Sequence, residues 1–132
     1  MKVAIIGSRS YNDNAVFYFV VLRIFLKIGF PQKIISGGAK GADNLAKLFA
    51  LEHNYDFEEF LPEFLNFPPG TRNFEAPHAR NSKIAESCDY IIAFWDMKSS
   101  GTKDTIDKSI AMGKIVYVYD FVNNFIYTIE DI

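Results

Sequence analysis

The sequence predicts an α/β protein in which a mostly parallel, five-stranded sheet carries helices on both faces, as a three-layer sandwich. Two observations lead to this fold class. Short apolar runs alternate along the chain with longer segments of helical periodicity. Each apolar run is continuous rather than alternating in polarity, which is typical of parallel strands covered on both faces. With 132 residues, the chain is expected to form one domain, residues 1–132.

The expected strands each stop at a residue that favours a turn. These stops, in order, are Gly7, Ser36, Pro62, Asp96 and Asp120. The strands themselves are expected at residues 3–6, 33–35, 56–61, 90–95 and 115–119.

Four helical patterns fill the gaps, at residues 13–28, 42–52, 77–87 and 102–112. Asn12 or Asp13 is suited to cap the first helix. Pro77 suits the first turn of the third helix, and Gly113 suits the end of the fourth. The resulting βαβαβαβαβ order predicts right-handed crossovers in a parallel sheet. The tail, residues 125–129, is expected either to add an edge strand or to pack across the sheet.

Composition restricts the class of protein. Hydrophobic residues make up 49% of the chain and aromatic residues 16%, which is enough for a core and excludes a disordered chain. The net charge of −2 argues against duplex nucleic acid as the partner. The single cysteine, Cys88, excludes a disulfide framework within one chain, and His53 and His78 are not spaced as metal ligands. We expect a cytoplasmic domain that holds no metal and requires no cofactor.

The most apolar segment, residues 15–30, is not expected to cross a membrane. It is shorter than the ~20 residues that a spanning helix needs, and it contains Arg23 and Lys27. A signal peptide is not expected either, because the strand-like residues 2–6 precede this segment and no cleavage site of small residues follows it.

Small polar residues and glycines follow three of the expected strands. Ligands of open parallel sheets bind beyond the carboxyl ends of the strands, where glycine lets the backbone approach and helix N-termini attract anions. A phosphate-bearing ligand is therefore expected at these turns. The candidate binding residues are Gly7, Ser8, Arg9, Ser36, Gly37, Gly38, Ala39, Lys40, Gly41, Asp43, Arg80, Asn81, Ser99, Ser100, Gly101 and Thr102.

Basic side chains near these turns strengthen the expectation. Arg9 and Arg80 are the better candidates, because a guanidinium can hold a phosphate with two parallel hydrogen bonds. The alternative for Arg80 is an ion pair with Glu75 or Asp89. Lys98 and Lys103, which flank the fourth-strand turn, are expected to be solvated.

A stretch rich in phenylalanine and proline separates the third strand from the third helix. It carries Pro68-Pro69-Gly70 together with Phe64, Phe67 and Phe74, and Phe60 precedes it. A segment of this length is either a functional loop or a packed surface flap.

Four motifs follow one another along the chain: Gly7-Ser8-Arg9, Ser36-Gly37-Gly38-Ala39-x-Gly41-Ala42-Asp43, Arg80-Asn81 and Ser100-Gly101-Thr102. Their order resembles the SLOG superfamily, which unites the Smf/DprA DNA-processing proteins with the cytokinin-activating LOG enzymes, and its small YspA-type branch in particular. The resemblance extends from Met1 to about Tyr119. It implies a Rossmann-like fold with a pocket for nucleotides or nucleotide-derived ligands.

One departure from the resemblance concerns catalysis. The LOG enzymes carry a glutamate, within G-G-x-G-T-x-x-E, that helps to cleave the N-glycosidic bond, and the similar position here is Thr105. Asp104 is adjacent but lies about 100° away around a helix. Arg80, Asp43 and Asp96 are the remaining catalytic candidates. Asp43 is suited either to bind a ribose hydroxyl or to stabilise a helix N-terminus.

Three functions therefore remain open. The first is binding of a nucleotide or nucleotide-derived phosphate ligand, as a sensor or carrier. The second is an N-glycosidase or phosphoribohydrolase acting on nucleoside monophosphates. The third is binding of single-stranded DNA, as in the Smf/DprA relatives, with Phe64 or Phe67 as stacking platforms.

The first helix is expected to take part in self-association. Its charges, Arg23 and Lys27, leave an arc of roughly 270° almost free of charge, whereas docking on a sheet uses only part of a helix surface. A homodimer or higher closed oligomer through residues 13–28 would cover the remainder. The alternative is that the tail covers it. Candidates for the exposed surface are Phe17, Tyr18, Val21, Ile24, Phe25 and Ile28.

Overall fold

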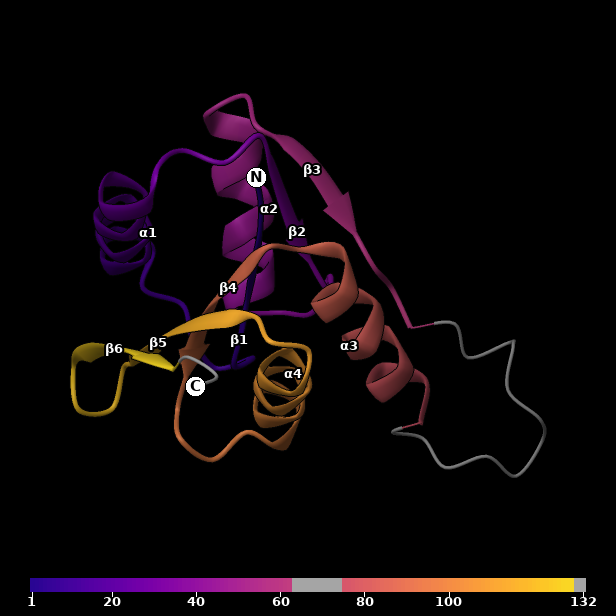
Figure 1. Cartoon of the computed structure of the whole chain (residues 1–132). Coiled ribbons are helices and arrows are strands. Elements are labelled where there is room, and N and C mark those ends of the chain that lie inside the picture. The colour runs from indigo at the N-terminus through magenta and orange to yellow at the C-terminus, as the bar shows by residue number, and fades with distance from the viewer. Residues whose placement is uncertain (63–74, 130–132) are drawn as a thin grey trace.

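A computed structural model describes residues 1–62 and 75–129 of the chain, as a six-stranded sheet with four helices (Figure 1). The interpretations placed on Phe64, Phe67, Phe74 and Pro68-Pro69-Gly70 lie outside the described residues. The elements, in order, are β1 (Lys2–Gly7), α1 (Asn14–Ile28), β2 (Lys33–Ser36), α2 (Ala42–Glu52), β3 (Asp56–Glu59), α3 (Glu75–Ser87), β4 (Tyr90–Trp95), α4 (Ser100–Ala111), β5 (Ile115–Asp120) and β6 (Phe125–Ile129).

The sheet has the strand order β3-β2-β1-β4-β5-β6. Strands β1 to β5 are parallel, as predicted, and β6 pairs antiparallel with β5. The tail therefore adds an edge strand, which was one of its two expected outcomes. The strand order reverses between β1 and β4, where Ile5 lies beside Ile92. A ligand site is expected beyond this reversal point in such a sheet.

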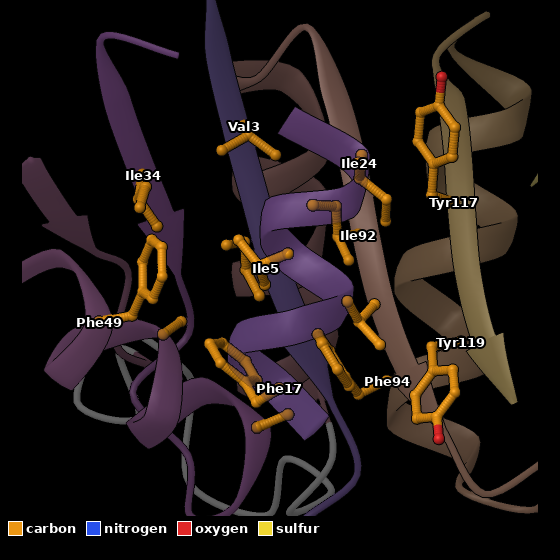
Figure 2. Close-up of a cluster of buried hydrophobic side chains, with 14 of the residues drawn as sticks. Val3, Ile5, Phe17, Ile24, Ile34, Phe49, Ile92, Phe94, Tyr117 and Tyr119 are labelled. Atoms are coloured by element: carbon orange, nitrogen blue, oxygen red, sulfur yellow. The ribbon is translucent and has the colours of Figure 1, made fainter. Parts of the chain in front are cut away.

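Two hydrophobic clusters hold the layers together, one on each face of the sheet. Side chains at alternate strand positions point to opposite faces. Val3 and Ile5 pack with residues of α1 and α2, whereas Ala4 and Ile6 pack with residues of α3 and α4. Figure 2 shows the first cluster, with α1 lying over β1 and β4. The three-layer arrangement with helices on both faces is confirmed.

The helix ends follow from local chemistry. Asp13 caps α1, and its carboxylate accepts a hydrogen bond of 3.1 Å from the amide of Val16. Gly113 has a φ of 76° just beyond α4, in the left-handed region that glycine adopts readily. The third helix begins at Glu75, two residues before the predicted start at Pro77. Proline is tolerated there because amides of a first turn have no partner within the helix.

The third strand is shorter and more exposed than predicted. It ends at Glu59 rather than at residue 61, and none of its residues is fully buried. The reason is its position: β3 is the edge of the sheet and pairs with β2 alone.

The expected exposed surface of α1 is largely wrong. Phe17, Val21, Ile24 and Phe25 are buried in the first cluster. The helix contacts both the sheet and α2, so its core-facing stripe is wider than docking on a sheet alone requires. Its large exposed apolar side chains are Tyr18, Phe19 and Leu26, of which Leu26 is 74% exposed. No helix within the described residues is long and apolar enough to cross a membrane.

Self-association through α1 stays a prediction, and Leu26 now provides its test. We expect light scattering to give the mass of a dimer or larger closed oligomer, and Leu26→Glu to shift that mass to the monomer, because a buried charge opposes the interface. Leu51→Glu, at a 63% exposed position on α2, is the matched control. A monomeric mass for the unmodified protein at micromolar concentration contradicts the prediction.

Candidate functional site

A cavity of about 630 Å³ lies beyond the carboxyl ends of β1 and β4, at the reversal point of the sheet. Residues from the turns after these strands and from the N-terminal parts of α3 and α4 surround it. Most of the predicted site residues line it: Gly7, Ser8, Arg9, Ala39, Asp43, Arg80, Asn81, Asp96, Ser99, Ser100, Gly101 and Thr102.

The glycine turn after β2 contributes less to the cavity wall than predicted, since only Ala39 and Asp43 of this segment line it. Ser36 is buried, and its hydroxyl donates a hydrogen bond of 2.7 Å to the carbonyl of Ile5. Lys40 is exposed. The remaining predicted residues of this turn, Gly37, Gly38 and Gly41, do not line the cavity either.

Sequence reasoning missed several lining residues. Ser10 continues the Gly7-Ser8-Arg9 turn, and Pro77 and His78 lie shortly before Arg80 in α3. Their closeness in sequence to predicted residues was the available signal for these three. Ile6, which directly precedes Gly7, and Ile84 also line the cavity, and their apolar side chains gave no signal of a binding role.

Gly7 brings three backbones together at the base of the cavity. A Cβ at this position would lie 2.3 Å from the carbonyl oxygen of Phe94 and 2.8 Å from Cβ of Ala42. No larger residue fits without displacing β4 or α2. A similar approach occurs at Gly41, which has a φ of 76° and whose Cβ would lie 2.4 Å from the carbonyl oxygen of Ser8. The turn after β1 and the turn after β2 are therefore in direct backbone contact.

Asp43 fastens these turns with its carboxylate. One oxygen accepts a hydrogen bond from the amide of Gly7 and the other from the amide of Ala39, both at 3.2 Å. The side chain is buried. Burial raises the pKa of Asp43 to about 6, although the hydrogen bond from Ala39 and the charge of Arg80 act in the opposite direction.

Arg80 is held by neighbouring atoms rather than free in the cavity. Its Nε donates to the side-chain oxygen of Asn81 at 2.8 Å, and Nη1 donates to the carbonyls of Gly37 and, at 3.4 Å, Phe60. Burial lowers the pKa of Arg80, and the charge of Asp43 opposes this. Arg80 forms no ion pair with Asp89, whose carboxylate accepts from the amide of Lys2 at 2.6 Å. The side chain of Glu75, the other expected partner, lies outside what the structure describes.

Asp96 shapes the turn that leads into α4. Its carboxylate accepts hydrogen bonds from the amides of Lys98 (2.9 Å) and Ser99 (2.7 Å) and from the hydroxyl of Ser99 (2.9 Å). Partial burial raises the pKa of Asp96, but these hydrogen bonds outweigh it and hold the pKa below its usual value. The hydroxyl of Ser8 accepts from the amide of Asp96 at 3.1 Å, which joins this turn to the end of β1.

The N-terminus of α4 faces the cavity without a side-chain cap. Ser99 occupies the N-cap position, yet its side chain makes no capping hydrogen bond to the helix. A Cβ built at Gly101 would meet nothing within 4 Å, so the space beside the first turn is open. Free amides and the positive end of the helix dipole can therefore bind an anion here. Lys98 and Lys103 do not line the cavity, and Lys103 pairs with Asp107 at 2.8 Å.

No carboxylate replaces the glutamate of the LOG enzymes on α4. Thr105 lines the cavity, is buried, and donates from its hydroxyl to the carbonyl of Gly101 at 3.3 Å. Asp104 does not line it and instead accepts from Asn81 (3.1 Å) and Lys108 (2.7 Å). Within residues 1–62 and 75–129, no group of three or more His, Cys, Asp or Glu side chains could hold a metal ion.

The buried carboxyl of Asp43 predicts a pH-dependent stability. Between its ordinary pKa of 3.8 and the raised value of about 6, the folded state retains a proton that the unfolded state releases. The free energy of unfolding should therefore fall with rising pH by roughly 3 kcal/mol over this window, relative to Asp43→Asn. Chemical denaturation of both proteins at pH 4 to 8 measures the difference. If the free energy of unfolding, relative to Asp43→Asn, instead rises with pH, the hydrogen bonds to Asp43 and the charge of Arg80 outweigh the effect of burial.

Comparison with known protein families matches residues 1–67 to the YspA, cpYpsA-related SLOG family. Comparisons with curated proteins and with solved structures found no significant match. The matched segment includes the turns after β1 and β2, and thus Gly7, Ala39 and Asp43 of the cavity wall. It spans half of the chain, and this protein therefore belongs to the YspA, cpYpsA-related SLOG family.

Proposed function

We propose that this protein binds a nucleotide or a nucleotide-derived phosphate ligand in the cavity beyond β1 and β4, as a sensor or carrier. The observation that carries the proposal is the uncapped N-terminus of α4, which opens into a cavity that also receives Arg9 and Arg80. Membership of the SLOG family is compatible with a ligand of this class.

The phosphate is best placed against the first turn of α4, at Ser100, Gly101 and Thr102. All three residues line the cavity, and backbone amides of a first turn lack partners within the helix. Arg9 is exposed beside them and forms no ion pair with the described residues, so its guanidinium is available to a ligand. In this proposal the glycine turn after β2 supports the site, and it reaches the ligand only through Ala39.

Arg80 has a different part in the same site. Three of its donor positions are directed at Asn81, Gly37 and Phe60, which fixes the orientation of the guanidinium. Arg80 still lines the cavity. We therefore assign Arg80 as a fixed cation of the site, and Arg9 as an exposed cation that no ion pair with the described residues holds.

Both arginines provide tests of ligand binding. We expect Arg9→Ala to weaken the best ligand of a nucleoside monophosphate panel more than tenfold, because a charge-assisted contact to phosphate is lost, with an unchanged melting temperature. Arg80→Ala should weaken binding similarly and also lower the melting temperature, since it frees the carbonyl of Gly37. Calorimetry measures the dissociation constants, and Lys47→Ala, exposed on α2, is the control. Unchanged constants in both variants remove the arginines from the site.

A hydrolase is the second candidate, and Asp43 is the residue that favours it. Asp43 lines the cavity beside Arg80, and its pKa of about 6 lies closer to neutrality than that of an ordinary aspartate. Against this role, both of its oxygens already accept backbone amides. Asp96 is the weaker catalytic candidate, because its lowered pKa makes it a poor base.

We predict that purified protein releases no adenine from AMP above the uncatalysed rate. The physical reason is that Thr105 offers a hydroxyl where a carboxylate would be needed, and that Asp104 is bound by Asn81 and Lys108. Chromatographic detection of the free base over hours checks this. Robust release that Asp43→Asn abolishes would establish the hydrolase instead.

The DNA-binding alternative is tested by adding a single-stranded oligonucleotide to the panel of nucleoside monophosphates. A gel shift that weakens with salt would support this alternative.

A further inference from the structure

A second cavity, of about 780 Å³, lies on the opposite side of α1 from α2, between α1 and the β5–β6 hairpin. We call it the α1–β6 groove. Tyr117, Tyr119 and Ile126 form part of its lining, and the first two are more than 90% buried. Phe19 of α1 and Phe125 of β6 line it as well, and both are about half exposed or more. The groove thus has a buried aromatic floor between apolar walls.

The groove results from the way in which the helices cover the sheet. In the β5–β6 pairing, Tyr119 lies beside Ile126 and Tyr117 beside Thr128, so these side chains share one face. Helix α1 lies over β1 and β4 on this face, and Tyr117 and Tyr119 project from β5 beyond it (Figure 2). The opposite face of β5 packs against α4. Within the described residues, no helix continues the layer of α1 and α2 over β6.

The described residues that line the groove carry charge of one sign. Arg23 and Lys27 are among them, and no aspartate or glutamate is. Because they are four residues apart on α1, the two cations lie on the same side of the helix. Lys27 lies over the ring of Tyr117, with Nζ 5.9 Å from the ring centroid. Arg23 makes no ion pair with any residue of the described ranges. Burial, together with the charges of Asp13 and Asp120 outside this lining, raises the pKa of Tyr119.

We propose that the α1–β6 groove is a second binding site, and that its ligand is a small amphiphilic carboxylate. The apolar chain or ring of the ligand lies along Tyr119, Ile126 and Phe125, and its carboxylate lies between Arg23 and Lys27. Apolar lining with a few convergent polar groups is what small-molecule sites share, and the volume falls within their range of about 300–1,000 Å³. This proposal does not rest on the function proposed for the first cavity.

The charges also argue against a second copy of the chain as the occupant. A two-fold contact presents the same patch from both partners. A contact centred on this groove would bring Arg23 and Lys27 of both copies into one interface, with no aspartate or glutamate among the described lining residues to pair with them, which is unfavourable. Self-association through the part of α1 that carries Leu26, which does not line the groove, is a separate contact. An anion with an apolar body satisfies both the cations and the aromatic floor.

Decanoate is the probe, titrated into the full-length protein by calorimetry and by amide NMR shifts. We expect saturable binding whose shifts map to residues 19–27 and 124–128 and leave Gly101 unaffected. The double variant Arg23→Gln/Lys27→Gln should weaken binding at least tenfold, because both charged contacts are lost. Lys47→Gln, exposed on α2 and outside both cavities, is the matched control and should bind normally. Decyltrimethylammonium, which has the same chain and the opposite charge, should not bind.

Three outcomes would overturn the proposal. Equal binding of decanoate and decyltrimethylammonium would show that the cations contribute nothing. Shifts confined to the first cavity, or the absence of saturable binding, would show that the groove is not a site for this class. If the protein is an oligomer that binds decanoate only as the Leu26→Glu monomer, a second copy occupies the groove instead. Binding of AMP to the first cavity is measured separately and does not decide among these results.

Discussion

The close approach of backbones at Gly7 is the constraint on which the cavity depends. Without a side chain at this position, the end of β1 can touch both the carbonyl of Phe94 on β4 and the side chain of Ala42 on α2. The amide of Gly7 is then near enough to donate to Asp43, which in turn holds Ala39. The two turns and the end of β4 consequently meet at one edge. A side chain at this position would separate them, because the nearest obstacle is backbone that cannot rotate away.

The charged groups around the cavity divide into those that build it and those left for a ligand. Asp96 accepts hydrogen bonds within the turn that precedes α4, and Asp104 accepts them from Asn81 of α3 and Lys108 of α4. Asp43 and the buried part of Arg80 face each other, so each offsets some of the cost of burying the other. What remains is the guanidinium of Arg9 and the amides of α4, which are donors only. An arrangement in which the carboxylates position backbone and the free groups are donors favours anion binding over acid–base chemistry.

The sequence was sufficient for the five parallel strands, apart from the end of β3, and for the edge at which the cavity lies, because continuous apolar runs and turn residues are local signals. It was insufficient where the burial or bonding of a residue depends on elements that are distant in the sequence. The buried face of α1 includes Phe17 and Phe25 because the helix packs against Phe49 of α2 as well as the sheet, and periodicity does not state how many neighbours a helix has. Likewise, the sequence placed Gly37 at the ligand, whereas its carbonyl is used by Arg80, a residue 43 positions away.

One buried aromatic residue lies between the lining of the first cavity and that of the second, although it lines neither. Tyr11 follows the turn that carries Arg9 and Ser10, and it is buried against the ring of Phe94 at 5.0 Å and that of Tyr119 at 6.4 Å between centroids. Tyr119 is part of the lining of the α1–β6 groove. Its hydroxyl is fixed by Asn124 at 2.6 Å, so the ring is held from both ends. Close-packed rings leave no free volume to absorb a displacement. A ligand that moves the turn after β1 together with Tyr11 would therefore also shift Tyr119, which forms part of the floor of the groove.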